Sequence, residues 1–441
     1  MISFHADRSH AAAVPGSPSP EEARDFPSGG VRRCGRPDRG DPAMRAPNRS
    51  RHDVVIVGGR VAGSATAMLL ARLGHDVVVV DQALFPSDTV STHSIARSGV
   101  VQLRRWGLLD AVLDSGAPAI RQVTFHALGD SVSRPVKLKA GIDFVVAPRR
   151  YVLDAIVATA AERAGADVRP GVTVTGVRRD GRGRAVGVYG RDRAGAPIDI
   201  GARYVIGADG LQSRVARSVG AAISEVRQAD GATQYAYYAG IPWTGNEFFV
   251  GARSLAGVFP THDGQACIWI CNPCADAKAV RRRTASRAEA FYELLERSAP
   301  QLAERLGHAR RTSPVSGMLR MPNQLRQAFG PGWALVGDAG YHRDAVTGYG
   351  ISDAFRDAEF LAVALDQALG AGAEETAALT LYQLQRDQAL REIFEITCRL
   401  AAYPAVPAFI ALQKQLSTAI DKQAAALAAR PVPGERLLAT A

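Results

Sequence analysis

Cysteine and long apolar runs are scarce in this chain. The five cysteines among 441 residues are an odd number, which does not suit a secreted disulfide framework and favours a reducing compartment. No apolar run approaches the ~20 residues that span a bilayer, and the N-terminus lacks the hydrophobic core of a signal peptide. These absences predict a cytoplasmic protein without a transmembrane segment.

Three of the cysteines lie close together in the sequence. Cys267, Cys271 and Cys274 have a spacing that would suit a metal, but no fourth Cys or His lies close by. Cys267 also falls inside the strand-like stretch 266–270. We therefore expect buried structural cysteines and no metal site.

Basic residues outnumber acidic ones, which gives a formal net charge of +10 and suits anionic ligands such as dinucleotides. They are spread along the chain without an aromatic-interleaved stripe, which argues against nucleic-acid binding. An apolar fraction of 47% allows one large core or two joined cores. We expect a globular protein, monomeric or homodimeric, that acts on a small molecule.

Residues 1–50 are rich in Pro, Gly, Ser and Arg and have almost no periodic apolar pattern. Such a segment cannot offset the entropy of ordering itself, so we expect a disordered extension. Met44 lies just ahead of the first predicted strand. A biological start at a later residue, or an over-extended reading frame, would therefore explain the lack of pattern in this segment. A functional basic tail is the alternative.

Residues 53–81 have the pattern of strand, glycine turn, helix, strand and terminal acid. The short apolar runs at 54–57 and 77–80 predict parallel strands covered on both faces. Gly58 permits the tight turn, and Gly63 allows the helix to pack closely on the strand. Asp81 ends the second strand at about the distance where an acid accepts from a ribose hydroxyl. The stretch therefore predicts a dinucleotide-binding βαβ unit.

The turn of this unit contains one departure from the G-x-G-x-x-G pattern. Gly59, Arg60 and Ala62 lie where the helix N-terminus offers free N–H groups to a pyrophosphate, but Arg60 occupies the place of the second glycine. The arginine has two interpretations. It covers the diphosphate as a charged donor, or it turns outward to solvent while its backbone N–H binds.

A polar loop at 85–93 follows the second strand, and by topology it faces the cofactor region. His93, at its end, is a candidate for contact with cofactor or substrate, or for acid–base chemistry. A lone histidine in a Ser/Thr loop is more often a helix cap or a surface residue. We prefer that second interpretation.

The later pattern predicts an α/β fold with two domains. A Rossmann-like domain with a parallel sheet takes 51–230 and 310–400, and an antiparallel-sheet substrate domain takes 231–309. Residues 120–147 are open to assignment to either domain. A helical tail covers 401–441.

Three separated stretches resemble the superfamily of FAD-dependent monooxygenases that includes single-component aromatic hydroxylases, with geranylgeranyl reductase-like proteins and flavin halogenases as relatives. The resemblance covers roughly residues 52–400. The βαβ unit is similar to the family's ADP-binding fingerprint at Gly58, Gly63 and Asp81, and Arg60 departs from it. The first domain would accordingly be an FAD-binding domain.

The second stretch, 209–213, resembles the family's D-G motif. Asp209 would lie on a segment that approaches both the FAD pyrophosphate and the nicotinamide nucleotide, although Ala216 stands where an arginine is expected. Arg150 has a spacing similar to the family's second cofactor arginine. The resemblance implies that Arg150 approaches the FAD phosphates or the ribityl chain.

The third stretch resembles the family's G-D motif at Gly337 and Asp338, whose aspartate binds the ribityl chain. Gly348 and Gly350 lie where a helix N-terminus would face the flavin pyrimidine ring, and Ala345 replaces the usual proline. A helix opened by glycine supplies uncrowded N–H donors to the negative charge of a reduced flavin.

The resemblance implies FAD as cofactor and NAD(P)H as co-substrate. The leading hypothesis is a monooxygenase that hydroxylates or epoxidises a small hydrophobic or aromatic substrate. The alternatives are an FAD-dependent reductase of isoprenoid-like double bonds and a non-catalytic flavin-binding protein. Because FAD would carry the chemistry, no side chain besides the candidate His93 is named as catalytic.

Overall fold

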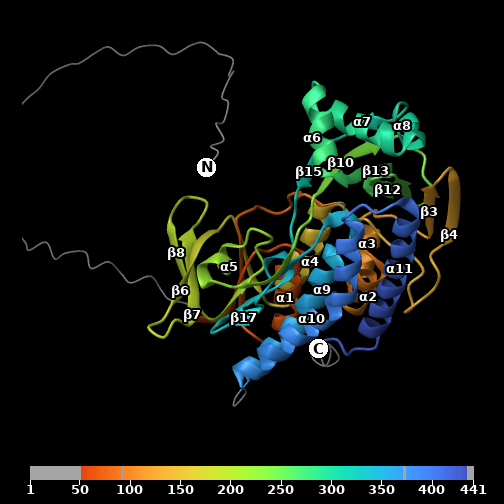
Figure 1. The fold of residues 1–441 in the computed structure, drawn as a ribbon. Helices are drawn as coiled ribbons and strands as arrows, with labels where there is room; N and C mark the ends of the chain where they lie inside the picture. The colour runs from red at the N-terminus through yellow and green to blue at the C-terminus, as the bar shows by residue number, and fades with distance from the viewer. Residues whose placement is uncertain (1–50, 92, 371–373, 435–441) are drawn as a thin grey trace, which may run out of the picture. The chain divides into compact units, whose positions relative to one another are not determined.

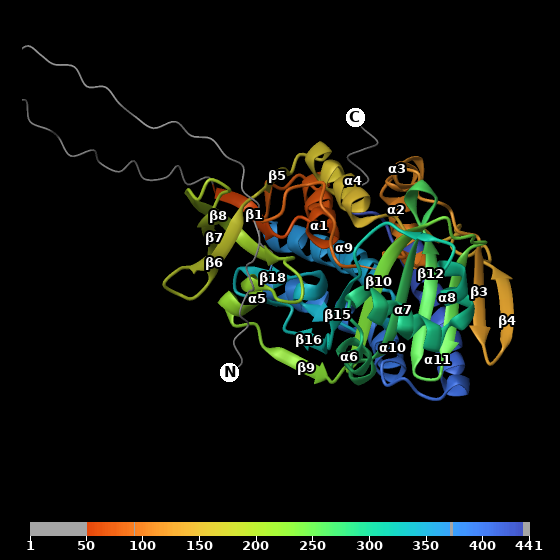
Figure 2. The same ribbon diagram turned by 90° about the horizontal axis from the view of Figure 1, so that it is seen from above.

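The computed structural model describes residues 51–91, 93–370 and 374–434. The extension expected at 1–50 lies outside the described residues. The described residues form one compact unit. The chain folds around two large sheets, and Figures 1 and 2 show the unit from two sides.

The first sheet is centred on β1 (Arg51–Val57), which pairs in parallel with β2 (Val77–Asp81) and β8 (Pro197–Gly207). The strand order is β17-β18-β8-β1-β2-β5, and β7 and β6 continue the sheet from β8. The other strands are β5 (Asp167–Pro170), β6 (Thr173–Arg179), β7 (Ala185–Arg191), β17 (Phe329–Gly330) and β18 (Trp333–Leu335).

Both faces of the parallel strands are covered, which explains their unbroken apolar runs. Val54 and Ile56 pack in a core with helices on one face, whereas Val55 and Val57 pack in another core with Val215 of a short helix. The covering helices are α1 (Val61–Arg72), α2 (Arg97–Arg105), α3 (Leu109–Asp114), α4 (Arg150–Arg163) and α9 (Gly350–Leu369) on the first face, and α5 (Arg214–Val219) on the second.

The second sheet has the order β14-β10-β13-β12-β11-β3-β4, with β15 beside β10. Figure 2 shows β3 and β4 at one end of it. Its strands are β3 (Gln122–Ala127), β4 (Asp130–Pro135), β10 (Gly231–Ala239), β11 (Asn246–Gly251), β12 (Ser254–Pro260), β13 (Gln265–Pro273), β14 (Arg310–Arg311) and β15 (Ser316–Leu319). The sheet therefore extends beyond residue 309, where the predicted substrate domain ends, and β3 and β4 belong to it.

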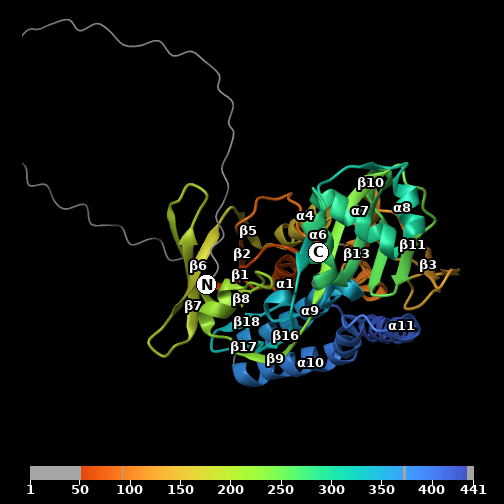
Figure 3. The ribbon, with the colours of Figure 1, turned by 45° about the horizontal axis from the view of Figure 1, so that its top comes forward.

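Alternation along β10 divides the side chains of this sheet between two cores. Ala236 and Tyr238 pack with α6 (Cys274–Arg283), α7 (Arg287–Ser298) and α8 (Pro300–Leu306), which cover one face in Figure 3. Tyr235 and Tyr237 point to the opposite face, whose core includes residues of α10 (Glu375–Leu400) and α11 (Val406–Ala428). Helix α6 is absent from the sequence prediction, because its buried residues Cys274, Ala277 and Val280 form only a narrow apolar stripe.

A third sheet is small and has three strands in the order β19-β16-β9. Its strands are β9 (Ile223–Arg227), β16 (Asn323–Arg326) and β19 (Tyr341–His342), and short 3-10 turns occur at η1 (His262–Gly264), η2 (Gly337–Ala339) and η3 (Ala345–Thr347). The predicted fold class is confirmed, with a parallel-containing sheet and an antiparallel sheet. Across the described ranges, no helix has the length and apolar character needed to cross a membrane.

Candidate functional site

A cavity of about 650 Å³ extends along the carboxyl ends of the first sheet towards β10 and β15 of the second sheet. Its wall includes every residue that the sequence nominated except Gly59 and Gly63. The nominated lining residues are Gly58, Arg60, Ala62, Asp81, His93, Arg150, Asp209, Gly337, Asp338, Gly348 and Gly350. Folding thus brings segments that lie up to about 290 positions apart in the sequence to one site.

The glycine turn that opens α1 is closely packed. Gly58 has a φ of +104°, and a methyl group there would lie 2.4 Å from the carbonyl oxygen of Ala208. A methyl group at Gly63 would lie 1.8 Å from the Gly58 oxygen. Both positions therefore require glycine for packing, and the first requires it also for backbone conformation.

Asp81 is held in place before any ligand arrives. Its Oδ2 accepts from the Gly59 N–H at 2.7 Å, and its Oδ1 accepts from the Ala83 N–H at 2.7 Å. A carboxylate oxygen has capacity for a further donor, and Asp81 lines the cavity. Two backbone N–H groups therefore fix the position of the Asp81 carboxylate at the cavity wall.

Arg60 and Arg150 meet at one carboxylate. The Arg60 guanidinium donates to Asp154 at 2.7 Å, and Arg150 donates to the same carboxylate at 3.0 and 3.2 Å. The Arg60 side chain is about a quarter exposed, at 24%. The side chain therefore does not turn outward to solvent, because the Asp154 carboxylate holds it at the cavity wall beside the start of α1.

Asp209 is engaged within its own turn. Its oxygens accept from the Ser213 hydroxyl at 2.5 Å and from the Arg214 N–H at 2.6 Å, so the acid caps α5 together with Ser213. Ala216 is buried in the core, whereas Arg214 and Arg217 are exposed and line the cavity. Two cations therefore flank the position where the family pattern expects an arginine.

The other end of the cavity is formed by η2 and the start of α9. Asp338 is exposed, while its neighbours Gly337 and Ala339 are buried. Gly348 and Gly350 have open space beside them, because a methyl group at either would meet no atom within 4 Å. The first N–H groups of α9 lack helical partners, so this helix start presents donors to the cavity.

Close packing joins this end of the cavity to the glycine turn. Gly337 has a φ of +60°, and a methyl group there would lie 2.9 Å from the side chain of Ala62 in the first turn of α1. A larger residue at position 62 would therefore separate η2 from α1. Both ends of the cavity depend on small residues at this contact.

The interpretation of His93 as a helix cap or surface residue is wrong. The side chain is 1% exposed, and the N-cap of the following helix, α2, is Ala96. The β10 face, with Tyr235 and Tyr237, buries the histidine, and a lone polar residue in a loop gives no sequence signal of that. His93 instead lies against the cavity wall with a φ of +45°.

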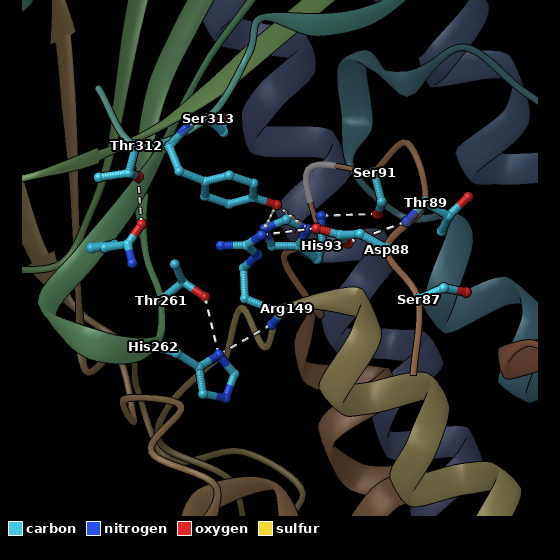
Figure 4. A network of polar contacts seen from close by, with 12 residues as sticks. Ser87, Asp88, Thr89, Ser91, His93, Arg149, Thr261, His262, Thr312 and Ser313 are labelled. Atoms are coloured by element: carbon cyan, nitrogen blue, oxygen red, sulfur yellow. Dashed lines mark hydrogen bonds and ion pairs between the residues drawn. The ribbon is translucent and has the colours of Figure 1, made fainter. Parts of the chain in front are cut away.

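A polar network surrounds His93, as Figure 4 shows. The Tyr237 hydroxyl lies 2.8 Å from Nε2 of His93, and the Arg149 guanidinium stacks 3.5 Å from the centre of the Tyr237 ring. Arg149 also donates to the Asp88 carboxylate at 2.8 Å. Burial, together with the charges of Arg149 and Arg150, holds the pKa of His93 well below its usual range, so the imidazole is neutral at pH 7.

Sequence reasoning did not identify the residues of the second sheet that face the cavity. They are Thr233 and Tyr235 of β10 and Gly317 and Met318 of β15, and Met321, two residues after the end of β15, also lines the cavity. The period-two pattern of β10 places Thr233, Tyr235 and Tyr237 on one face, but it does not say which face meets the site.

The cysteines take no part in the site. Cys267, Cys271 and Cys274 are buried, and burial raises the pKa of Cys271 to about 12. Within the part of the chain that the structure describes, no cluster of His, Cys, Asp or Glu side chains could hold a metal ion. The Thr233 hydroxyl lies 3.2 Å from the Cys271 sulfur, which satisfies both groups internally.

Comparison with known proteins identifies this architecture. The family model of the FAD binding domain matches residues 51–397. The chain belongs to this FAD-binding family. It is an FAD-dependent oxidoreductase.

Individual members of the family resemble the chain over most of its length. A menaquinone reductase of Mycolicibacterium smegmatis is 29% identical over 68% of this chain and 73% of its own. A digeranylgeranylglycerophospholipid reductase of Methanocella arvoryzae is 24% identical over 78% of this chain and 84% of its own. The monooxygenase-like PqsL of Pseudomonas aeruginosa, solved with 2-aminobenzoylacetate, superposes with a TM-score of 0.70 at 25% identity, over 83% of this chain and all of its own.

Proposed function

We propose that this FAD-dependent oxidoreductase is an NAD(P)H-dependent monooxygenase that hydroxylates or epoxidises a small hydrophobic or aromatic substrate. The observation that supports this most directly is the single cavity of about 650 Å³ that joins the Asp81 end to the β10 wall. It falls within the ~300–1,000 Å³ of ordinary ligand sites.

The residues along the cavity fit FAD in order. Asp81 would accept from the adenosine ribose, the first N–H groups of α1 and the Arg60–Arg150 pair would meet the pyrophosphate, and Asp338 would accept from the ribityl chain. The open N–H groups at the start of α9 would meet the pyrimidine end of the flavin. When bound, FAD accepts a hydride from NAD(P)H and supplies the electrons of the reaction.

The second sheet would supply the substrate end of the cavity. Tyr235, Met318 and Met321 present aromatic and thioether groups, and Thr233 adds a hydroxyl. Such a wall suits an apolar ring better than a strongly charged molecule. Excluding water is the main task of these residues, because a flavin that is shielded from water loses fewer electrons to side reactions.

Reduction of an isoprenoid-like double bond is the second candidate. It is favoured by the sequence relatives, a menaquinone reductase and a digeranylgeranylglycerophospholipid reductase, which match at 29% and 24% identity. A non-catalytic flavin-binding role would leave the reduced nucleotide unconsumed.

Oxygen dependence separates the two candidates. Hydroxylation consumes O₂, NAD(P)H and a proton and releases NAD(P)⁺ and water, whereas reduction adds the hydride and proton to the double bond and needs no oxygen. A panel of small aromatic compounds and an isoprenoid quinone should be tested aerobically with isotopically labelled O₂ and then anaerobically. We expect label in the product of an aromatic substrate and no anaerobic product. Anaerobic saturation of the quinone side chain would reject the monooxygenase proposal in favour of the reductase.

We also propose a cytoplasmic location, supported by the scarcity of cysteine, and a monomer or homodimer. Size-exclusion chromatography with light scattering would measure the oligomeric state directly. A mass above that of two chains would contradict the second part.

A further inference from the structure

Arg60 occupies the second glycine position of the fingerprint without backbone strain. Its φ of −84° and ψ of −167° are ordinary extended values, and it is the N-cap residue of α1. Glycine is therefore not required there for conformation. The side chain lies at the cavity wall, so the effect of arginine at this position depends on the groups that its guanidinium contacts.

The Arg60 guanidinium connects three separate parts of the chain. From the start of α1 it reaches Asp154 of α4 at 2.7 Å. It also donates to the backbone oxygen of Ser87 at 3.0 Å and to the Ser87 hydroxyl at 3.1 Å. Asp154 is fully buried, so this anchor is shielded from water, and hydrogen bonds to it are stronger than those at a surface.

Residues 82–91, which we call the covering segment, form part of the cavity wall. Gln82, Ala83, Thr89, Val90 and Ser91 of this segment line the cavity. On the side of the second sheet the segment is attached through Asp88 to Arg149, and through the Ser91 N–H to the hydroxyl of Tyr235 at 3.3 Å. Arg60 makes the corresponding attachment on the side of the glycine turn.

Packing strengthens this attachment. The Phe85 ring lies against the glycine turn, since a methyl group at Gly59 would come within 3.2 Å of it, and the Arg60 guanidinium lies 5.8 Å from the ring centre. The covering segment therefore touches α1 through both polar and apolar groups. Arg60 provides the polar part.

Charge at this point favours an anionic ligand. Two guanidinium groups, of Arg60 and Arg150, share the single carboxylate of Asp154, and both line the cavity beside the start of α1. One positive charge is left over where the helix N-terminus offers its free N–H groups. A pyrophosphate would complete the balance of charge.

We propose that Arg60 is a positioning residue that fastens the covering segment over the pyrophosphate of FAD, so that cofactor retention and order in residues 82–91 depend on the same side chain. The inference rests on the proposed binding of FAD in this cavity. On this proposal, arginine in place of the second fingerprint glycine strengthens FAD binding.

The substitution Arg60→Gly tests this directly, because it restores the fingerprint and glycine is a tolerated N-cap. We expect FAD to bind at least ~10-fold more weakly, since a charge-assisted contact is worth about one such factor or more. Backbone amides of residues 82–91 should exchange hydrogen faster in the holoprotein. FAD titration of apoprotein and hydrogen exchange measured by mass spectrometry provide the two readouts.

Controls separate the inference from general damage. Arg72→Ala removes an arginine at the other end of α1, where it donates to the Trp106 oxygen, and should change neither readout. Arg60→Lys keeps the charge but not the forked donors, so its FAD affinity should lie between those of the wild type and Arg60→Gly. If Arg60→Gly is too unstable to purify, Arg60→Gln serves, with the same loss expected.

Equal or tighter FAD binding by Arg60→Gly, with unchanged exchange in 82–91, would overturn the inference while the proposed function stands. Weaker binding without faster exchange would also overturn it, because Arg60 would then act only as a charge. If the wild-type chain binds no FAD, the proposed function itself fails.

Discussion

Two carboxylates at opposite ends of the cavity differ in how they are held. Asp81 already accepts from two backbone N–H groups, so its position is set by the turn. Asp338 is exposed at the cavity, and no described side chain or backbone group donates a hydrogen bond to it. We therefore propose that Asp338 makes a hydrogen bond only when the cofactor is bound.

Replacing Asp338 with Ala should weaken FAD binding by ~1.5–3 kcal/mol, the value of a hydrogen bond to a charged group. The thermal stability of the apoprotein should hardly change, because no group among the described residues bonds to this side chain. Asp338→Asn, which keeps the shape and an acceptor oxygen, should lose less. Titration of apoprotein with FAD measures the effect, and an unchanged Kd for Asp338→Ala would show that the ribityl chain is held elsewhere.

His93 predicts a pH effect on folding. Burial first, and then the charges of Arg149, Arg150 and His262, lower its pKa in the folded chain. In the unfolded chain the pKa of His93 is about 6.5. Below that pH the unfolded chain binds a proton at His93 that the folded chain does not. The free energy of unfolding therefore falls as the pH decreases, by up to ~1.4 kcal/mol per pH unit. This contribution is fully present above pH 6.5.

Denaturant unfolding of the wild type and His93→Gln between pH 7.5 and pH 5 would test this effect. The variant should lose stability less steeply as the pH falls, because one titrating group has been removed. Parallel curves for the two proteins would mean that His93 protonates in the folded state as easily as in the unfolded state.

At the scale of elements, the β1–α1–β2 unit was predictable from the sequence, whereas the substrate end of the cavity was not. The first depends on local signals: apolar runs at 54–57 and 77–80, glycines and a terminal acid. The second depends on which face of β10 meets the cavity, and period-two alternation leaves that open. His93 was misjudged for the same reason, since its burial comes from β10 residues that lie some 140 positions later in the sequence.

A prediction about the glycine turn has a control at the other end of α1, where Gly74 follows the helix. Gly58→Ala must adopt a φ of +104° and place a methyl group 2.4 Å from the Ala208 oxygen, whereas Gly74→Ala must adopt a φ of +90° in open space. Left-handed backbone costs an L-residue ~1–2 kcal/mol, and overpacking adds ~1–3 kcal/mol. The backbone cost is common to both variants, so Gly58→Ala should be less stable than Gly74→Ala by about the overpacking cost, ~1–3 kcal/mol.

Denaturant unfolding of both variants measures this difference. Gly58→Ala should also lose FAD, because Ala208 precedes Asp209 at the cavity and would have to move. Equal stabilities for the two alanine variants would show that the turn relaxes without cost.

At the scale of the whole molecule, the cavity exists because the two large sheets meet at the carboxyl ends of the parallel strands. The residues that we propose to bind FAD lie in or next to β1, α1, β2, α4, α5, η2 and α9, and the proposed substrate wall comes from β10 and β15. Neither part closes the cavity alone. Cofactor reduction and substrate chemistry should accordingly belong to the one folded unit that the described residues form.

The most direct test of the account is whether the purified chain binds FAD and passes electrons to it from a reduced nucleotide. Apoprotein should be titrated with FAD under absorbance and flavin fluorescence, and NADPH or NADH should then be added anaerobically. We expect saturable binding of one FAD per chain, followed by bleaching of the oxidised flavin band by at least one nucleotide. An apoprotein that is folded but binds no FAD, or a bound flavin that neither nucleotide bleaches, would contradict the central claim.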